Sequence, residues 1–87
     1  METEQIKGSL REYIVNHFKV PANDPEFNDT VHLFDYGYVD SFGAVDLVSF
    51  VQDKFGVTVS QSDLIAYPMN SISEIADFVS MRERGEL

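Results

Sequence analysis

The segment from residue 41 to residue 55 is the feature that most constrains the fold of this chain. It follows a turn-rich stretch, Leu33-Phe34-Asp35-Tyr36-Gly37-Tyr38-Val39-Asp40, and Gly56 supplies a left-handed helix stop after it. At about 100° per residue, one face of the expected helix is apolar, comprising Ala44, Leu47, Val48, Val51 and Phe55. A helix with such a face is stable mainly when that face is buried, so the rest of the chain must pack against it.

Start and stop signals predict three further helices. The first runs from about Thr3 to Phe18. A short third helix follows the cap sequence Ser60-Gln61-Ser62-Asp63 and ends at Pro68. The fourth opens on the capping box Ser71-Ile72-Ser73-Glu74 and continues to about Arg84.

The connection between the first and second helices is long and rich in turn formers, including Pro21 and Pro25. Its apolar residues can pin it to the core, which predicts an ordered loop; they are Phe27, Val31, Leu33 and Phe34. The β-branched run Val57-Thr58-Val59 could form a strand. No second credible strand exists to pair with it, so we expect an extended linker there.

These elements predict an all-α fold. We expect a four-helix bundle with three longer helices, one short third helix and a long ordered loop between the first two. At 87 residues there is no room for a second core, so residues 1–87 form one expected domain.

The charge balance narrows the classes of partner. Fifteen acids against six bases give a formal charge of −9, which disfavours nucleic acid and anionic membrane surfaces. It favours protein partners with basic docking patches, although acidity also serves solubility alone. No apolar run is long enough to insert into a membrane, and we expect a cytoplasmic monomer.

Few side chains are suited to chemistry. Cysteine is absent, which excludes disulfides, thiolate metal sites and a thiol nucleophile. The acids are scattered without the spacing of a calcium loop, so no metal site is expected. We expect no catalytic residue in this chain.

Ser41 stands at the amino end of the expected second helix. Unpaired amides and the helix dipole favour a negative group there, so a phosphodiester on the Ser41 oxygen would be stabilised. Gly43 lacks a Cβ and would leave room for a bulky adduct or for the enzyme that attaches it. Asp40 could orient the hydroxyl. The alternative is that Ser41 or Asp40 only caps the helix.

The same helix has a second face opposite its core face. It combines apolar anchors with acids, which indicates a docking surface rather than a plain solvated face; the residues are Phe42, Val45, Asp46, Ser49 and Asp53. Phe50 lies on a flank, where we expect it to pack against the third helix or the long loop.

The string Gly37-Tyr38-Val39-Asp40-Ser41-Phe42-Gly43-Ala44-Val45-Asp46-Leu47-Val48 resembles the attachment region of acyl carrier proteins and peptidyl carrier domains. Members of this family have an Asp-Ser-Leu-like triplet that opens their second helix. The resemblance extends over the whole chain, through the first amphipathic helix, the Leu-Phe loop, the short third helix and the closing helix.

The resemblance implies that Ser41 carries 4′-phosphopantetheine transferred from coenzyme A, whose thiol holds an acyl or aminoacyl thioester. It implies that Asp40, Phe42, Val45 and Asp46 meet a phosphopantetheinyl transferase and the partner enzymes. Those partners would be adenylate-forming acyl or aminoacyl ligases, synthases or transferases. A protein of this kind catalyses nothing itself.

Two departures bear on the subtype. Two residues, rather than one, separate Gly37 from the Asp-Ser pair, and Gly43 is unlike carriers of ordinary fatty acid synthesis. Both features resemble D-alanyl carriers and stand-alone carriers loaded by adenylate-forming ligases. D-alanyl carriers usually have Trp-Asn before the last helix, where this chain has Tyr67-Pro68-Met69-Asn70. We therefore expect a carrier of a specialised pathway, with the housekeeping and D-alanyl subtypes as alternatives.

Two other classes of function remain as alternatives. One is an unmodified acidic helical module that binds a basic partner through Phe42, Val45 and Asp46. The other is a hydrolase with Ser41 as nucleophile and His17 or His32 as base. The sequence gives neither histidine an activating context and contains no Gly-x-Ser-x-Gly elbow, so the hydrolase is disfavoured.

Overall fold

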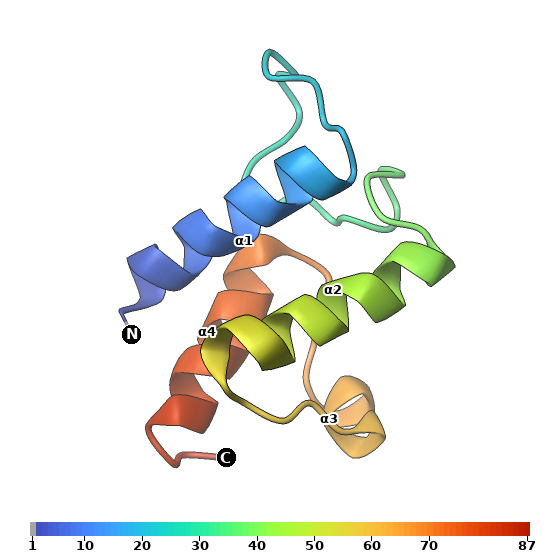
Figure 1. The fold of residues 1–87 in the computed structure, drawn as a ribbon. Coiled ribbons are helices and arrows are strands. Elements are labelled where there is room, and N and C mark those ends of the chain that lie inside the picture. Colours follow the sequence, from blue (N-terminus) through green and yellow to red (C-terminus); the bar gives the residue numbers. More distant parts are fainter. Residues whose placement is uncertain (1) are drawn as a thin grey trace.

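The computed structural model describes residues 2–87 and is all-helical over that range (Figure 1). The helices are α1 (Thr3–His17), α2 (Ser41–Phe55), α3 (Gln61–Ala66) and α4 (Ile72–Glu83). Residues 57–59 belong to an extended linker, and no strand forms within residues 2–87. The predicted all-α fold is confirmed, and the helix boundaries lie within about a residue of those expected from caps and stops.

α1 and α4 form the most closely packed pair of helices. Along α1, Ile6, Leu10 and Ile14 recur every fourth residue and are fully buried. α4 buries apolar side chains on several sides; they are Ile72, Ile75, Ala76, Phe78 and Val79. Burial of large apolar side chains contributes about 1.5–3 kcal/mol each, so this pair supplies a large share of the stability.

α2 runs back in the direction opposite to α1 (Figure 1). It buries Leu47, Val51 and Phe55 towards the core and ends at Gly56, whose φ of 66° lies in the left-handed region. Phe50 stacks on Tyr13 of α1, with ring centroids 4.0 Å apart and planes 12° apart. The expectation that Phe50 packs on the third helix or the long loop was wrong, because its flank of α2 faces α1.

The connection between α1 and α2 is ordered by its own side chains, as predicted. Leu33 is fully buried, and Val31 and Val39 are buried beside the core. The backbone N–H of Leu33 donates to the carbonyl of Asn70 at 2.7 Å, which ties the loop to the segment before α4. The embedded apolar residues therefore hold this long segment in place.

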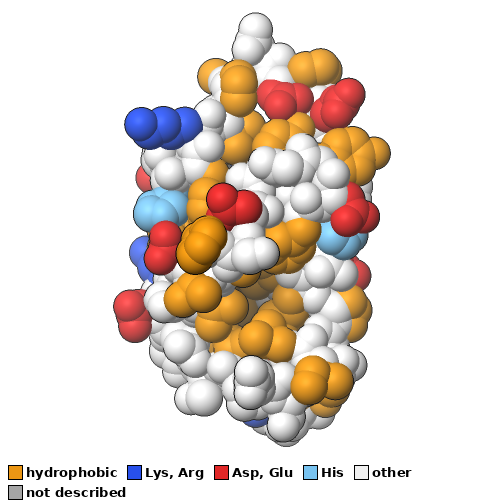
Figure 2. Space-filling model, turned by 90° about the vertical axis from the view of Figure 1, so that its right-hand side faces the viewer, with side chains coloured by type: hydrophobic (Ala, Val, Ile, Leu, Met, Phe, Trp, Pro, Cys, Tyr) orange, Lys and Arg blue, Asp and Glu red, His pale blue; other side chains and the backbone are white. Residues whose placement is uncertain are grey.

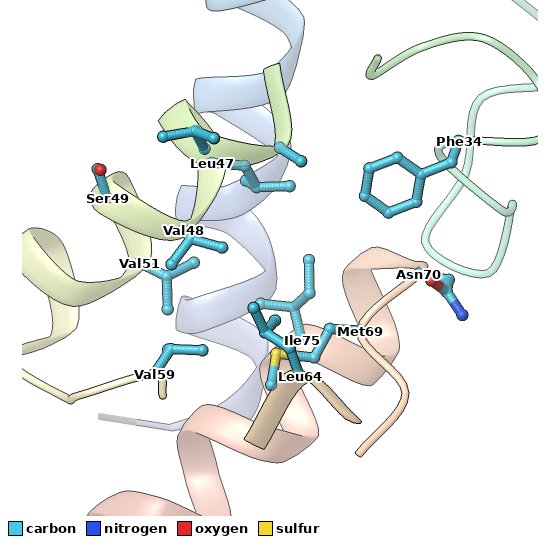
Figure 3. A pocket seen from close by; sticks show the side chains of 12 residues that line it. Phe34, Leu47, Val48, Ser49, Val51, Val59, Leu64, Met69, Asn70 and Ile75 are labelled. Atoms are coloured by element: carbon cyan, nitrogen blue, oxygen red, sulfur yellow. The ribbon is translucent and has the colours of Figure 1, made fainter. Parts of the chain in front are cut away.

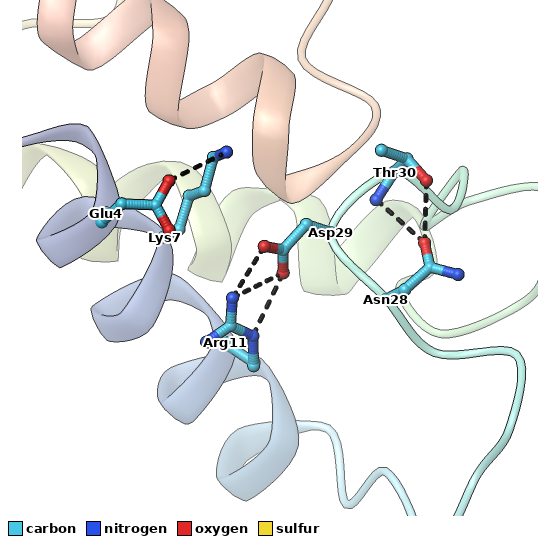
Figure 4. A network of polar contacts seen from close by, with 6 residues as sticks. All are labelled: Glu4, Lys7, Arg11, Asn28, Asp29 and Thr30. Atoms are coloured by element: carbon cyan, nitrogen blue, oxygen red, sulfur yellow. Dashed lines mark hydrogen bonds and ion pairs between the residues drawn. The ribbon is translucent and has the colours of Figure 1, made fainter.

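An ion pair fastens the same loop to α1. Arg11 donates from Nη2 to both carboxylate oxygens of Asp29, at 2.8 and 2.7 Å, and from Nε at 3.1 Å (Figure 4). The backbone oxygen of Asp29 accepts from the Ser73 amide of α4 at 2.9 Å. One loop residue thus connects α1 and α4, in the forked geometry that favours arginine over lysine.

The amino end of α4 differs in one detail from the expected capping box. Ser71 caps it as predicted, since its hydroxyl accepts from the Glu74 amide at 3.2 Å. The Glu74 carboxylate, however, accepts from the Asn70 amide at 3.1 Å. It therefore satisfies a donor one residue earlier than the capping box requires.

Among the described residues, no helix combines the length and the apolar character needed to cross a membrane.

α3 is capped from both directions within its first turn. The Ser60 hydroxyl accepts from the Asp63 amide at 3.1 Å, and the Asp63 carboxylate accepts from the Ser60 amide at 2.9 Å. The Asp63 carboxylate also accepts from Arg82 Nη2 of α4 at 2.6 Å. The Ser60 amide, together with the Arg82 guanidinium, holds the pKa of Asp63 below its usual value.

Candidate attachment site and docking face

The amino end of α2 is capped by Asp40. Its Oδ1 accepts from the Gly43 amide at 2.7 Å, and its backbone oxygen accepts from the Ala44 amide at 2.9 Å. Its extended backbone, with φ −97° and ψ −176°, is that of an N-cap residue. Of the two residues that could have served as the cap, Asp40 takes this role, and Ser41 becomes the first residue of the helix.

Ser41 is exposed at the first position of α2. The helix behind it is anchored by the buried side chains of Leu47 and Val51. A group attached to this hydroxyl could extend into solvent without displacing any core residue, so the position fits a long covalent arm. The Asp40 carboxylate already uses the Gly43 amide, so the helix end offers an added phosphodiester less help than the sequence alone implied.

Gly43 has a role other than the one expected from its missing Cβ. It is buried, and an added Cβ would lie 2.5 Å from Cε1 of Phe18 and 3.2 Å from Cγ1 of Val39. The glycine therefore lets the first turn of α2 approach the end of α1 and the preceding loop. The prediction that it leaves room for an adduct or an enzyme was wrong, because the residue faces inwards.

The residues of the predicted docking surface all lie on the exposed side of α2. The exposed fractions of Phe42 and Val45 are 87% and 67%, and Asp40, Asp46, Ser49 and Asp53 are exposed as well. Figure 2 shows hydrophobic side chains in a band down one face of the molecule, with carboxylates along its edges. The arrangement meets the requirements of a docking surface, and the binding role of these residues stays a prediction.

Asp46 differs from the other carboxylates of this face because it pairs with a side chain of another helix. Its Oδ2 lies 3.2 Å from Nε2 of His17, and the His17 ring stacks on Tyr13 with centroids 4.9 Å apart. The other histidine, His32, accepts the Asp35 amide at Nδ1 at 3.0 Å. Each histidine has a partner other than Ser41, so the geometry lends no support to the hydrolase alternative.

An apolar cavity of about 350 Å³ lies between α2, α3 and the start of α4, and sequence reasoning missed it (Figure 3). Ala44, Val48 and Val51 of α2 line one side, with Leu64 of α3 and Met69 on the other. The sequence placed these three α2 residues on the core face, but the facing elements do not fill the space, and Val45 and Ser49 of the predicted docking surface line the cavity as well. A signal was available, because a helix of only six residues offers few side chains to close such a gap.

Comparison with known families supplies the observation that decides the class of this protein. The family model described as phosphopantetheine attachment site matches residues 9–79, most of the chain. The chain belongs to this family. The match includes α2 with Asp40 and Ser41, α3, and the core residues of α4 as far as Val79. Comparison with curated proteins finds no significant match.

Domains of this family are the sites of covalent 4′-phosphopantetheine attachment, and the protein is a phosphopantetheine-carrying carrier protein. The arm supplies a thiol, which this chain lacks because it contains no cysteine. Such domains are generally non-catalytic and work with a phosphopantetheinyl transferase and biosynthetic enzymes. α2 is anchored in the core and presents an exposed serine with the predicted docking surface beside it. This arrangement is compatible with the role of a carrier protein.

Proposed function

We propose that Ser41 is the attachment residue and that the protein carries acyl or aminoacyl groups as thioesters in a specialised biosynthetic pathway. The observation that carries the assignment is that Asp40 caps α2, which leaves the exposed Ser41 hydroxyl at the tip of the helix. A hydroxyl in this position can be reached by a transferase and afterwards moves with a rigid helix.

Four of the other serines are less suitable. Ser60 and Ser71 accept amide hydrogen bonds as helix caps, and Ser71 is buried. Ser80 is buried and lies 2.9 Å from the Thr3 hydroxyl. Ser49 is exposed on α2 but lies two turns further along, away from the helix end. These differences favour Ser41 over these four residues.

The docking surface supports enzymes with basic patches as partners. Phe42 and Val45 offer apolar contact, and the exposed carboxylate of Asp53 adds to the net charge of −9. Charge of opposite sign speeds encounter, and desolvated apolar anchors supply much of the affinity. A phosphopantetheinyl transferase and an adenylate-forming ligase that loads the arm would both meet this surface.

The cavity favours a cargo with an aliphatic part. Its lining is almost entirely apolar, formed by valine, leucine, methionine and phenylalanine side chains. A charged aminoacyl group would lose hydration there without gaining a partner, whereas an alkyl chain would gain from burial. We therefore favour an acyl cargo over a charged aminoacyl cargo.

The test is covalent modification followed by intact mass measurement. The purified protein is incubated with coenzyme A and a phosphopantetheinyl transferase of broad specificity. We expect the wild type to gain one phosphopantetheinyl mass and Ser41→Ala to gain none while keeping its helical circular dichroism. Ser62→Ala, which removes an exposed serine of α3 outside the docking surface, is the matched control and should be modified fully. Modification of Ser41→Ala, or none of the folded wild type, would refute the assignment.

A further inference from the structure

α3 lines the cavity without being anchored in the core. None of its six residues is buried, and its Ile65 is 87% exposed. The segments on either side are not helical, and Pro68 follows the C-cap residue Tyr67. Leu64 nevertheless lines the cavity from this helix (Figure 3). Apolar contacts hold the residues that flank it, since Val59 is buried and the Tyr67 ring lies 5.8 Å from the Phe78 ring. The helix itself has no buried residue, which is typical of segments that open locally, so a further contact is needed to hold it closed.

A polar contact to α4 supplies that hold. Arg82 Nη2 donates to Asp63 Oδ1 at 2.6 Å, and both side chains are largely shielded, with 29% and 14% of their side-chain surface exposed. The Arg82 guanidinium also lies over the Phe78 ring, 5.1 Å from its centroid. Arg82 is thus fixed on the most deeply buried helix, and α3 is attached to it through Asp63.

The same contact leaves a donor unsatisfied. Arg82 Nε is buried and has no hydrogen-bond partner among the described residues. A buried donor without a partner opposes the closed arrangement, because it would regain hydrogen bonds on exposure to water. A strong charge-assisted bond therefore holds α3 closed, while a desolvated donor favours opening.

We propose that the Asp63–Arg82 pair is a clasp that holds α3 over the apolar cavity and sets how readily α3 moves away from α2. Arg82 is then a positioning residue for the cavity, although it does not line it. The use of this motion to admit an acyl chain rests on the proposed function. The motion itself is a property of the fold and can be tested before any arm is attached.

Residue 59 offers a reporter for this motion. Val59 lines the cavity and is 9% exposed, and its amide donates to Oε1 of Gln52 in α2 at 2.9 Å. This bond keeps residue 59 on α2 while α3 moves. The chain contains no cysteine, so Val59→Cys introduces a single thiol into the unmodified protein. Its reactivity depends on how often α3 moves away from α2.

The experiment measures alkylation of this thiol by N-ethylmaleimide, a small uncharged reagent, in the full chain before phosphopantetheine is attached. We expect V59C/R82Q to react about tenfold faster than V59C, since the variant lacks one charge-assisted hydrogen bond. V59C/R84Q is the matched control. Arg84 bonds Glu86 at 2.8 Å and Ser80 at 3.3 Å, neither of which lies in α3, so its rate should equal that of V59C. Equal rates in V59C and V59C/R82Q would overturn the proposal.

Amide hydrogen exchange separates local opening from general loss of stability. In Arg82→Gln, the amides of residues 61–67 should exchange faster while those of α1 keep their wild-type protection. Faster exchange throughout the chain would overturn the proposal. Asp63→Asn is a second variant should Arg82→Gln fold poorly, because its amide oxygen can still cap α3. Asp63→Asn should also raise the alkylation rate of the thiol at residue 59 and speed amide exchange in residues 61–67. If it changed neither, the clasp would be contradicted.

The two proposals fail independently. If Ser41→Ala still accepts phosphopantetheine, the attachment assignment fails while the thiol and exchange results stand. If the Arg82 variants behave as wild type, the clasp fails while the attachment assignment stands.

Discussion

The two sides of this molecule use their apolar residues differently. Where α1 packs on α4, Ile6, Leu10 and Phe78 are essentially inaccessible to solvent. On the side of α2 and α3, Phe42 and Ile65 are each 87% exposed, and a cavity remains between the helices. Apolar burial in the first region supplies stability, and exposure in the second leaves surfaces available for cargo and partners. A small carrier can keep such surfaces because the other half of the bundle stabilises the fold.

The largest expected effect tests whether stability resides in the α1–α4 region. Phe78→Ala should lower the free energy of unfolding by about 3–5 kcal/mol, because it removes a ring that is 1% exposed and leaves a cavity. Urea denaturation followed by circular dichroism measures the loss. Phe42→Ala, the same substitution on the exposed face, should stay within about 0.5 kcal/mol of wild type. Similar losses in the two variants would contradict the division of roles.

A smaller effect tests the junction between the two regions at Gly43. Gly43→Ala places a Cβ against Phe18, whose ring is hemmed in by Tyr13 and His17 at centroid distances of 6.0 and 4.8 Å. Overpacking of about 1–3 kcal/mol should outweigh a gain of about 1 kcal/mol in helix propensity, giving a net loss near 1 kcal/mol.

Gly8→Ala is the control for Gly43→Ala. Gly8 lies within α1, and an added Cβ would meet nothing within 4 Å. The propensity gain should therefore appear alone, raising the free energy of unfolding by up to about 1 kcal/mol. Thermal and urea denaturation should show a lower free energy of unfolding for Gly43→Ala and a higher one for Gly8→Ala. If Gly43→Ala instead raised the free energy of unfolding, the contact between Gly43 and Phe18 would be loosely packed, which would contradict this interpretation.

The smallest expected effect concerns the titration of Asp63 at the clasp. The folded-state pKa of Asp63 lies below its ordinary value, so the carboxylate contributes stability above the unfolded-state pKa. That contribution is lost as the pH falls through the folded-state pKa. The Ser60 amide, which donates to Asp63, can report this titration by NMR. We expect the wild-type midpoint to lie below that of an aspartate in an unfolded peptide, and the midpoint in Arg82→Gln to be higher than in the wild type. A wild-type midpoint at or above that of the unfolded peptide would contradict the lowered pKa.

Much of the fold could be predicted because its signals are local. Gly56 and the caps at Ser60 and Ser71 act within a few residues, so the helix boundaries could be read from the chain. The position of Ser41 at the start of α2 followed from the same signals. The prediction for Phe50 failed because a helical wheel places a side chain on a flank without saying which neighbour covers it.

The candidate site could be predicted only in part for the same reason. The exposure of Phe42 and Val45 followed from their position opposite the core face. The cavity did not, because its volume depends on the separation of α2 from α3 and α4. The pairing of Asp46 with His17 also joins residues far apart in the chain, and no spacing pattern indicates it.

The amino-acid sequence by itself determined the helices, their caps and the exposed serine that follows an acidic cap, since these depend on interactions within a turn or two of the chain. Tertiary structure decided that Gly43 faces Phe18, that a cavity remains beside α2, and that Asp63 reaches Arg82. These features depend on distances between helices. Those distances are set only when side chains from every element compete to fill the same core.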